Sequence, residues 1–338
     1  MVKYKKISII IVTWNNEKKL PVCLKYISKQ DYPEDKLEVI IVDGGSQDNT
    51  LIIAEKFKKT HNLKIIKTNI RDPEQKRAIG VLEAKGDYIC VVDPDVYLTH
   101  RNWLKEMISP LESDATLTGS QTLYYEYNKN ESLINRYFAL FGFNDPVAFY
   151  LKKADRIPHF ESKWLFNTNF IDKKSYFEVT FDKDIPTMGS NGAVFRKGHY
   201  LKADLKPVNY FHIDAIQDMI NKGYKKYAIV KNSVLHSTSS SLWGSIKRRI
   251  WYMRTHYFTK NNKRRYLVYN SKITKDKINL AKFIFFTLTI WQPLYLSIKG
   301  YLKIPDLAWF LHLPMCFVFF FAYAYAVIIK AFQIDGAN

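Results

Sequence analysis

The residues most clearly suited to bind a ligand or a metal are Asp93 and Asp95, two carboxylates separated by one proline. The uncharged run Tyr88–Val92 precedes them and is rich in β-branched and aromatic side chains, which is typical of a strand buried on both faces. Because Pro94 cannot continue a strand, both carboxylates are expected at its carboxyl end, where open α/β sheets bind ligands. Oxygen ligands of this kind favour Mg²⁺ or Mn²⁺, usually together with a substrate's phosphates. The alternative is an ordinary acidic turn without a ligand.

Apolar runs and helical patterns alternate along the N-terminal part of the chain. Strands are expected at 7–12, 37–42, 64–68 and 88–92, and helices at about 20–29, from about 48 and at 73–85. This alternation is typical of a parallel sheet in a three-layer α/β domain. The second strand runs into Asp43, and the two glycines after it allow a tight turn with close approach of a ligand to the backbone.

The composition narrows the choice of partners. The 338 residues carry a formal net charge of +19, which suggests anionic lipid head groups, phosphorylated substrates or nucleic acid. An aromatic content of 15% argues against a disordered polycation. The distant cysteines Cys23, Cys90 and Cys316 are expected to be buried apolar residues of a reducing compartment. The run Ile7–Val12 is too short for a secretory signal, so none is expected.

The C-terminal part of the chain changes in character. A strongly basic stretch at 256–277 precedes two apolar segments, at about 278–298 and 307–329, each close to the length that spans a bilayer. Two spans would form a membrane-associated helical hairpin over 278–338 and keep both ends of the chain in the cytosol. Lys282 and Pro293 interrupt the first segment, which could instead lie in the membrane interface.

Three ordered motifs resemble family-two glycosyltransferases of the GT-A fold: Ser8–Asn16, Val42–Thr50 and Gly86–Asp95. The resemblance implies a GT-A (Rossmann-like) three-layer nucleotide-sugar-binding domain over 1–255. It also implies a nucleotide-sugar donor, a divalent cation and inversion at the anomeric carbon. The nucleotide-binding half would cover 1–96, and the acceptor half would occupy the rest of the domain, 97–255.

The same resemblance implies roles for individual residues. Thr13 and Asp43 would lie near the nucleotide base and Asp93 near the ribose or metal. The remaining donor residues would be Asn15 and Arg77. Asp95 would be the principal metal ligand, with Asp93 and the late histidine His236 completing the coordination of Mn²⁺ or Mg²⁺.

The catalytic base is the point where the chain departs from its relatives. Many relatives carry Glu-Asp-x-Asp at a fixed distance before a Gly-Tyr pair, whereas this chain has Phe211-His212-Ile213-Asp214 at that distance from Gly223. Asp214 is the first candidate and His212 the second. If the acceptor were a lipid phosphate, its oxygen would already be ionised and no strong base would be required.

Two further segments are expected near the sugar, the acceptor or its phosphates. The glycine-bearing segment 189–197 resembles the part of the family that approaches donor sugar and acceptor, and it contributes Gly189, Asn191 and Arg196. The basic-aromatic segment 247–251 contributes Arg248, Arg249 and Trp251, which could hold a diphosphate or an acceptor phosphate. This second segment lacks the full motif of processive relatives.

The sequence thus predicts an inverting glycosyltransferase at the cell membrane, with a cytosolic catalytic domain. Its partners would be a UDP- or GDP-sugar, an acceptor linked to polyprenyl or dolichyl diphosphate, and anionic membrane lipids, but no nucleic acid. Two alternatives stay open, a polyprenyl-phosphate sugar synthase and an inactive sugar-binding or scaffold protein. A sugar-nucleotide pyrophosphorylase would need a glycine-rich basic loop where the chain has Thr13–Asn16.

Overall fold

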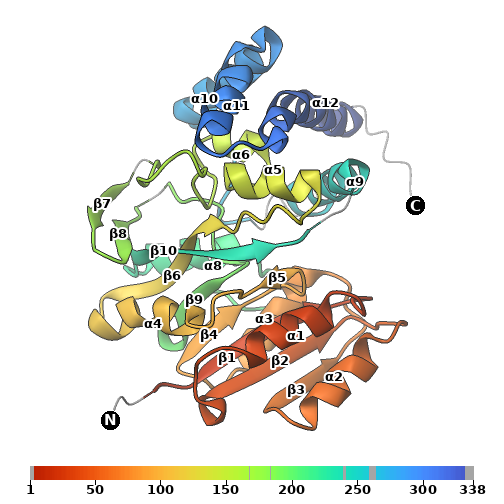
Figure 1. Ribbon diagram of the computed structural model, residues 1–338, viewed down its shortest axis with the longest axis vertical. Helices are drawn as coiled ribbons and strands as arrows, with labels where there is room; N and C mark the ends of the chain where they lie inside the picture. The colour runs from red at the N-terminus through yellow and green to blue at the C-terminus, as the bar shows by residue number, and fades with distance from the viewer. Residues whose placement is uncertain (1–3, 167, 183, 239–240, 259–263, 332–338) are drawn as a thin grey trace. The chain divides into compact units, whose positions relative to one another are not determined.

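The computed structural model describes residues 4–166, 168–182, 184–238, 241–258 and 264–331 (Figure 1). The chain forms two compact units. The sheet unit comprises Met1–Leu123 and Thr168–Ser237, and the helical unit comprises Tyr124–Asn167 and Thr238–Asn338. These boundaries differ from the expected single domain over 1–255, because residues 124–167 group with the C-terminal helices.

The sheet unit contains one mixed sheet with the strand order β3-β2-β1-β4-β9-β6-β10-β8-β7, and β5 pairs with β10. The parallel half consists of β1 (Ile7–Thr13), β2 (Leu37–Asp43), β3 (Leu63–Lys67) and β4 (Tyr88–Val91). The other strands are β5 (Val96–Tyr97), β6 (Leu117–Tyr125), β7 (Asn169–Asp172), β8 (Tyr176–Thr180), β9 (Ala193–Arg196) and β10 (Lys226–His236). The four strands expected at the N-terminus are therefore confirmed as a parallel group, and β9 continues the sheet antiparallel to β4.

Helices cover this sheet. All seven residues of β1 are buried, and since neighbouring residues of a strand point to opposite faces, both faces of β1 are covered. The helices of this unit are α1 (Leu20–Ser28), α2 (Thr50–Lys58), α3 (Pro73–Glu83), α4 (Trp103–Ser113), α7 (Lys197–Tyr200) and α8 (His212–Asn221), with a 3₁₀ turn η1 (Glu34–Lys36). Helix α3 packs on β1 and β2. It begins at Pro73 because the Asp72 side chain accepts a hydrogen bond from the backbone N–H of Glu74, 2.9 Å away.

The helical unit is built around an aromatic core. Its elements are α5 (Leu133–Phe141), α6 (Pro146–Tyr150), α9 (Leu242–Tyr252), a π-helical turn η2 (Met253–Phe258), α10 (Thr274–Thr289), α11 (Trp291–Lys303), a 3₁₀ turn η4 (Leu307–Leu311) and α12 (His312–Ala331). The imidazole of His312 stacks on the rings of Phe141 and Tyr150, at centroid distances of 4.2 and 5.9 Å. Trp309 packs edge-on against Phe141 at 4.8 Å. Helix α12 contacts α6, α9, α10 and α11, so it lies at the centre of this unit.

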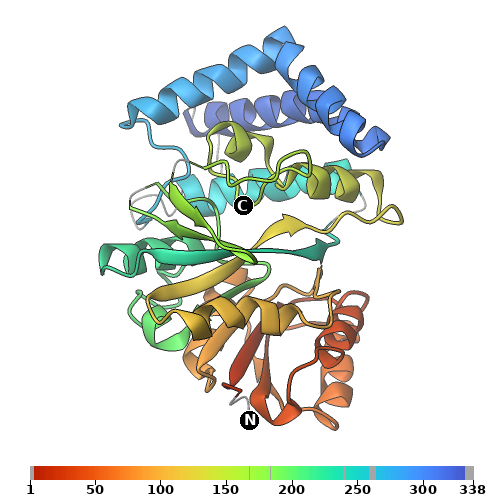
Figure 2. The same ribbon diagram turned by 60° about the vertical axis from the view of Figure 1, so that its left-hand side comes forward.

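The first apolar segment forms two helices with a bend between them instead of one straight helix. Helices α10 and α11 meet at Ile290 with a bend of 82° (Figure 2). Ile290 has a φ of 56°, and Pro293 in the first turn of α11 has no N–H to continue the hydrogen bonds of α10. Within the described part of the chain, one helix is long and apolar enough to cross a membrane, Leu307–Lys330 with a mean hydropathy of 1.9. The expected helical hairpin therefore consists of a bent pair, α10 and α11, followed by one apolar helix, and the pair would count as a second span only if its two helices form one broken span.

Candidate active site

The carboxyl ends of β1 and β2 form the first part of the site. Thr13 and Asp43 are partners in the parallel register and both are fully buried. The Thr13 hydroxyl donates to the Asp43 carboxylate at 2.9 Å, and the backbone N–H groups of Gly45 and Ser46 donate to it at 3.0 and 2.8 Å. The structure thus brings the two expected base-binding residues together. Asp43 thereby stabilises the glycine turn that follows β2.

Asn15 and Lys76 form hydrogen bonds that hold the loops at these strand ends. The backbone N–H of Gln47 donates to the Asn15 side chain at 2.9 Å, so Asn15 links the loop after β1 to the loop after β2. The Lys76 ammonium, buried in the first turns of α3, donates to the carbonyl of Thr13 at 2.7 Å. Burial lowers the pKa of Lys76 to about 8, although the nearby Asp43 carboxylate acts in the opposite direction.

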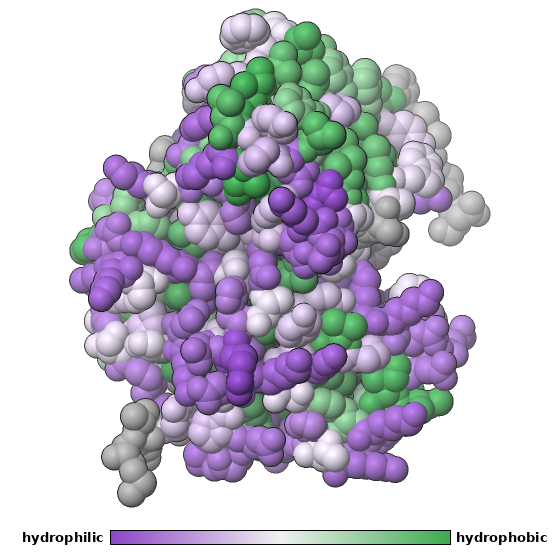
Figure 3. Space-filling view, viewed as in Figure 1, coloured by the Kyte–Doolittle hydropathy of each residue, from purple (hydrophilic) through white to green (hydrophobic). Residues whose placement is uncertain are grey.

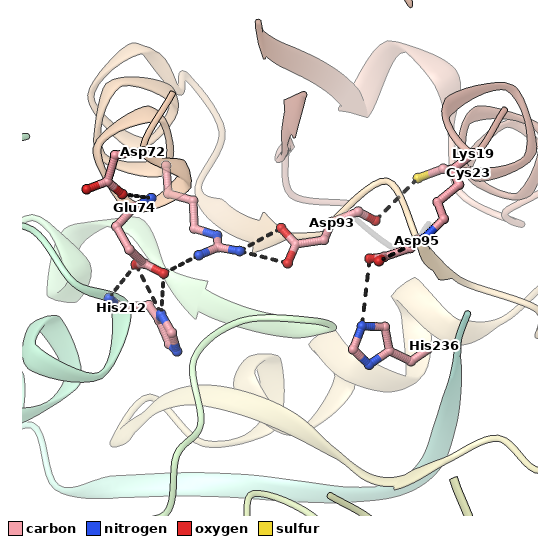
Figure 4. Close-up of polar contacts among 9 residues, drawn as sticks. Lys19, Cys23, Asp72, Glu74, Asp93, Asp95, His212 and His236 are labelled. Atoms are coloured by element: carbon pink, nitrogen blue, oxygen red, sulfur yellow. Dashed lines mark hydrogen bonds and ion pairs between the residues drawn. The ribbon is translucent and has the colours of Figure 1, made fainter. Parts of the chain in front are cut away.

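Asp95 lies beside His236, as expected, and also beside Lys19 (Figure 4). The short strand β5 pairs with the end of β10, which brings His236 opposite Val96. His236 Nε2 is 3.7 Å from Asp95 Oδ1. Lys19 Nζ is 3.3 Å from Asp95 Oδ2 and donates to the carbonyl of Ser237 at 3.0 Å.

Asp95 and His236 fit a divalent cation as a pair of ligands. Two atoms that each bind one ion at about 2.1 Å can be at most about 4.2 Å apart. The 3.7 Å between Asp95 Oδ1 and His236 Nε2 is within that limit. Among the described residues, no three or more His, Cys, Asp or Glu side chains form a group that could hold a metal. The remaining ligands would have to be substrate phosphates and water, which is common for Mg²⁺ sites.

Asp93 does not join Asp95 and His236 in a three-ligand group, because Arg77 engages it. Arg77 Nη2 is 2.7 Å from each carboxylate oxygen of Asp93, and Arg77 Nη1 contacts the carboxylate of Glu74. Burial alone would raise the pKa of Glu74, but the charge of Arg77 and the contacts with His212 hold it well below its usual range. The expected donor residues Arg77 and Asp93 are therefore partners in a buried ionic network.

The two candidates for the catalytic base begin α8 and differ in burial. Asp214 is fully buried. The His212 side chain remains 12% exposed, and its Nδ1 lies 3.0 Å from Glu74 Oε1. The backbone N–H of His212 also donates to Glu74 Oε2 at 3.0 Å, so Glu74 caps the N-terminus of α8.

The glycine-bearing segment lies beside the carboxyl end of β4. The N–H of Gly192 donates to the carbonyl of Val91 at 3.1 Å, two residues before Asp93. Gly189, Asn191 and Gly192 all have positive φ, of 108°, 54° and 91°, which gives the turn that delivers the chain to β9. Gly189 and Asn191 thus belong to a turn at the same edge as the strand-end carboxylates.

Arg196 was expected near the acceptor, and the structure contradicts this. Because β9 runs antiparallel to β4, Arg196 pairs with Tyr88 at the opposite end of β4. Its guanidinium donates to the carbonyls of Leu117, at 2.9 Å, and Asp114, at 3.2 Å. Arg196 therefore holds the connection between α4 and β6.

The three expected residues of the basic-aromatic segment lie on α9 of the helical unit. Arg248 and Trp251 are exposed. Arg249 Nη1 is 3.4 Å from the carboxylate of Asp145, and its guanidinium lies 6.0 Å from the ring of Phe319 on α12. Arg249 thus links α9 to its neighbours within the unit. From the sequence, this side chain was expected to bind a phosphate instead.

Residues 8–168 match the family described as "Glycosyl transferase family 2". The chain carries a family 2 glycosyltransferase domain. Apart from Ile7 at the start of β1, its parallel strands and the carboxylates at their ends lie within the matched residues.

Two curated relatives are similar to part of this chain. Poly(ribitol-phosphate) beta-N-acetylglucosaminyltransferase TarS of Staphylococcus aureus is 38% identical over 95 residues, 28% of this chain and 17% of TarS. A dolichyl N-acetyl-alpha-D-glucosaminyl phosphate 3-beta-D-2,3-diacetamido-2,3-dideoxy-beta-D-glucuronosyltransferase of Methanococcus voltae is 36% identical over 107 residues, 30% of this chain and 32% of that protein. The chain therefore spans less than a third of the length of either relative.

A solved mannosyltransferase structure resembles this chain over most of its length. The mannosyltransferase PcManGT from Pyrobaculum calidifontis, solved in complex with GDP-Man and Mn²⁺, superimposes with a TM-score of 0.54 at 14% identity. The superposition covers 96% of this chain and 88% of the mannosyltransferase. This likeness confirms the predicted GT-A fold.

Three residues of the family 2 domain were not singled out from the sequence: Lys19, Glu74 and Lys76. Glu74 and Arg77 are three residues apart in a helix, a spacing at which opposite charges meet, so the Glu74–Arg77 pair was open to prediction. Lys19 approaches Asp95 from a segment 76 residues away, and no local pattern encodes that contact.

Proposed function

We propose that the protein is an inverting glycosyltransferase that moves a sugar from a UDP- or GDP-sugar to a lipid-linked acceptor. The observation that supports this most is Asp95 beside His236 at the carboxyl ends of β4 and β10. This pair lies at the edge of a sheet whose first half belongs to family 2. The nucleotide would bind over Thr13, Asp43 and the loops that follow them, and its diphosphate would face Asp95.

The chain's own residues would bind and orient the donor. Asp95 and His236 would hold Mn²⁺ or Mg²⁺, and the bound cation would act as a Lewis acid that stabilises the charge developing on the departing diphosphate. Lys19 adds a fixed positive charge beside Asp95. Arg77 would orient Asp93 toward the donor's ribose, through two contacts of 2.7 Å.

The surface of the helical unit supports an acceptor carried by a membrane lipid. Large apolar side chains are exposed on α10 to α12, among them Phe285, Leu288, Trp291, Leu302 and Phe321, and Figure 3 shows hydrophobic surface gathered over these helices. The apolar helix Leu307–Lys330 could anchor the chain, with the catalytic unit in the cytosol. The name of the Methanococcus voltae relative describes a dolichyl-linked sugar phosphate, which agrees with a lipid-linked sugar as acceptor.

Product analysis tests this proposal. Full-length protein would be incubated with UDP- or GDP-sugars, Mn²⁺ and two synthetic acceptors, a polyprenyl phosphate and a polyprenyl diphosphate that already carries one sugar. We expect mass spectrometry to show a new glycosidic bond on the second acceptor. A sugar–phosphate bond on the first acceptor would support a polyprenyl-phosphate sugar synthase instead. Donor binding without any product would support a sugar-binding or scaffold protein.

A further inference from the structure

Glu74 and His212 are in contact, and Glu74 was not among the site residues expected from the sequence. His212 stands where many relatives carry an acid at this distance from the Gly-Tyr pair. In this chain a carboxylate beside His212 comes from Glu74 on α3. The two carboxylate oxygens of Glu74 lie 3.0 and 3.1 Å from His212 Nδ1. Both side chains are held in place, since Glu74 is fully buried and the His212 ring stacks on Phe211 at 4.8 Å.

This contact determines which ring nitrogen of His212 can take up a proton. A carboxylate accepts a hydrogen bond, so Nδ1 of a neutral His212 carries the hydrogen and Nε2 carries the lone pair. The imidazolium formed when Nε2 is protonated is then stabilised by the adjacent Glu74 carboxylate. Asp214 is less suited to this role because its carboxylate is fully buried, whereas His212 is partly exposed.

We propose that His212 is the general base of the transfer reaction and that Glu74 is its positioning residue. This rests on the proposed function. The acceptor hydroxyl oxygen forms a bond to the anomeric carbon while its proton moves to His212 Nε2. The bond from the anomeric carbon to the diphosphate oxygen breaks, and its electron pair leaves with the nucleoside diphosphate. A positioned base matters for a hydroxyl and not for an already ionised phosphate, so the dyad assigns a sugar hydroxyl as the attacking group.

The surroundings keep the dyad's charge balanced. Arg77 on α3 contacts Glu74, and Asp93 after β4 contacts Arg77 in turn. The phenols of Tyr200 and Tyr210 also lie within reach of the Glu74 charge, and burial raises the pKa of both, so they stay neutral. Asp214 on α8 is the other carboxylate close to His212 in sequence.

The His212→Gln variant tests the base directly. We expect its kcat to fall by about 10²–10⁴-fold, the usual contribution of a general base, with the donor Kd changed less than about twofold. The wild-type kcat should fall toward acid pH as the base becomes protonated, and this acid limb should disappear in the variant. His61→Gln, on the loop after α2, is the matched control and should leave kcat and its pH profile unchanged.

The Glu74→Gln variant tests the positioning role. We expect kcat to fall between about tenfold and 10⁴-fold, and the acid limb to move to lower pH because the protonated imidazole loses its carboxylate partner. Unchanged donor binding would show that the variant is folded. If Glu74→Gln does not fold, His212→Asn still decides the matter. The proposal is overturned if wild-type enzyme transfers sugar but both His212 variants keep its kcat and its acid limb. A wild-type protein that transfers no sugar would instead refute the proposed function.

Discussion

Individual residues at the site are charged and buried, and they neutralise one another. Lys76 lies beside Asp43, and Arg77 lies between Glu74 and Asp93. An uncompensated buried charge costs several kcal/mol, so each of these groups depends on its partner.

The cysteines, in contrast, are buried as apolar side chains. Burial raises the pKa of Cys23 and Cys90 far above the ordinary value, which keeps both thiols protonated and unreactive.

Lys76 should make the stability of the sheet unit depend on pH. Its folded pKa of about 8 is below that of an exposed lysine, so between about pH 8 and 10 the folded state binds fewer protons than the unfolded chain. The free energy of unfolding should therefore gain a rising contribution over this interval. Urea unfolding at pH 7 to 10 should show a flatter profile for Lys76→Met than for the wild type. The exposed control Lys85→Met should follow the wild type, and identical slopes for Lys76→Met and wild type would contradict this account.

Local patterns encode the elements, but not all the contacts between them. The strands at 7–12, 37–42 and 88–92 were predictable from runs rich in apolar β-branched residues, and α3 from its Asp72-Pro73 start. Asp95 and His236 were also predictable as neighbours, through the family resemblance. The position of Arg196 was not, because it depends on β9 running antiparallel to β4. The break at Ile290 had a visible cause in Pro293, but the sequence alone did not give its angle.

Gly300 on α11 permits close packing of Trp309 against the helix. A Cβ at Gly300 would lie 2.3 Å from Cδ2 of Trp309, which follows in η4. Gly300→Ala should therefore lower the free energy of unfolding by about 1–3 kcal/mol, the cost of overpacking a core. Differential scanning calorimetry would measure this as a lower Tm. Gly198→Ala is the matched control, since a Cβ there meets nothing within 4 Å, and an equal loss in both variants would contradict the packing argument.

At the scale of the whole molecule, a net charge of +19 accompanies exposed apolar side chains on the C-terminal helices. Both features favour an anionic membrane surface, through electrostatic attraction and apolar burial. The apolar helix is also integral to its unit, because α12 contacts α6, α9, α10 and α11. Deleting the chain after residue 277 should therefore damage the helical unit as well as remove a membrane anchor.

Vesicle flotation should reveal this surface. We expect the full-length protein to float with vesicles that contain phosphatidylglycerol more than with pure phosphatidylcholine, and binding should weaken with salt. The double variant Phe285→Gln/Leu302→Gln, at side chains exposed by 62% and 79%, should bind less. Ile52→Gln, on α2 of the sheet unit, is a control of similar exposure, at 55%. Equal binding to both kinds of vesicle by all three proteins would contradict the proposed membrane contact.

The most direct test of cation-dependent sugar transfer is to measure donor turnover by Asp95→Ala with Mn²⁺ or EDTA present. Wild-type protein should transfer sugar with Mn²⁺ and lose this activity in EDTA. Asp95→Ala should lose about 10²–10⁴-fold in kcat with Mn²⁺, because loss of the cation costs several kcal/mol in the transition state. The exposed control Asp35→Ala should match the wild type. Near-normal turnover by Asp95→Ala in EDTA would contradict the account.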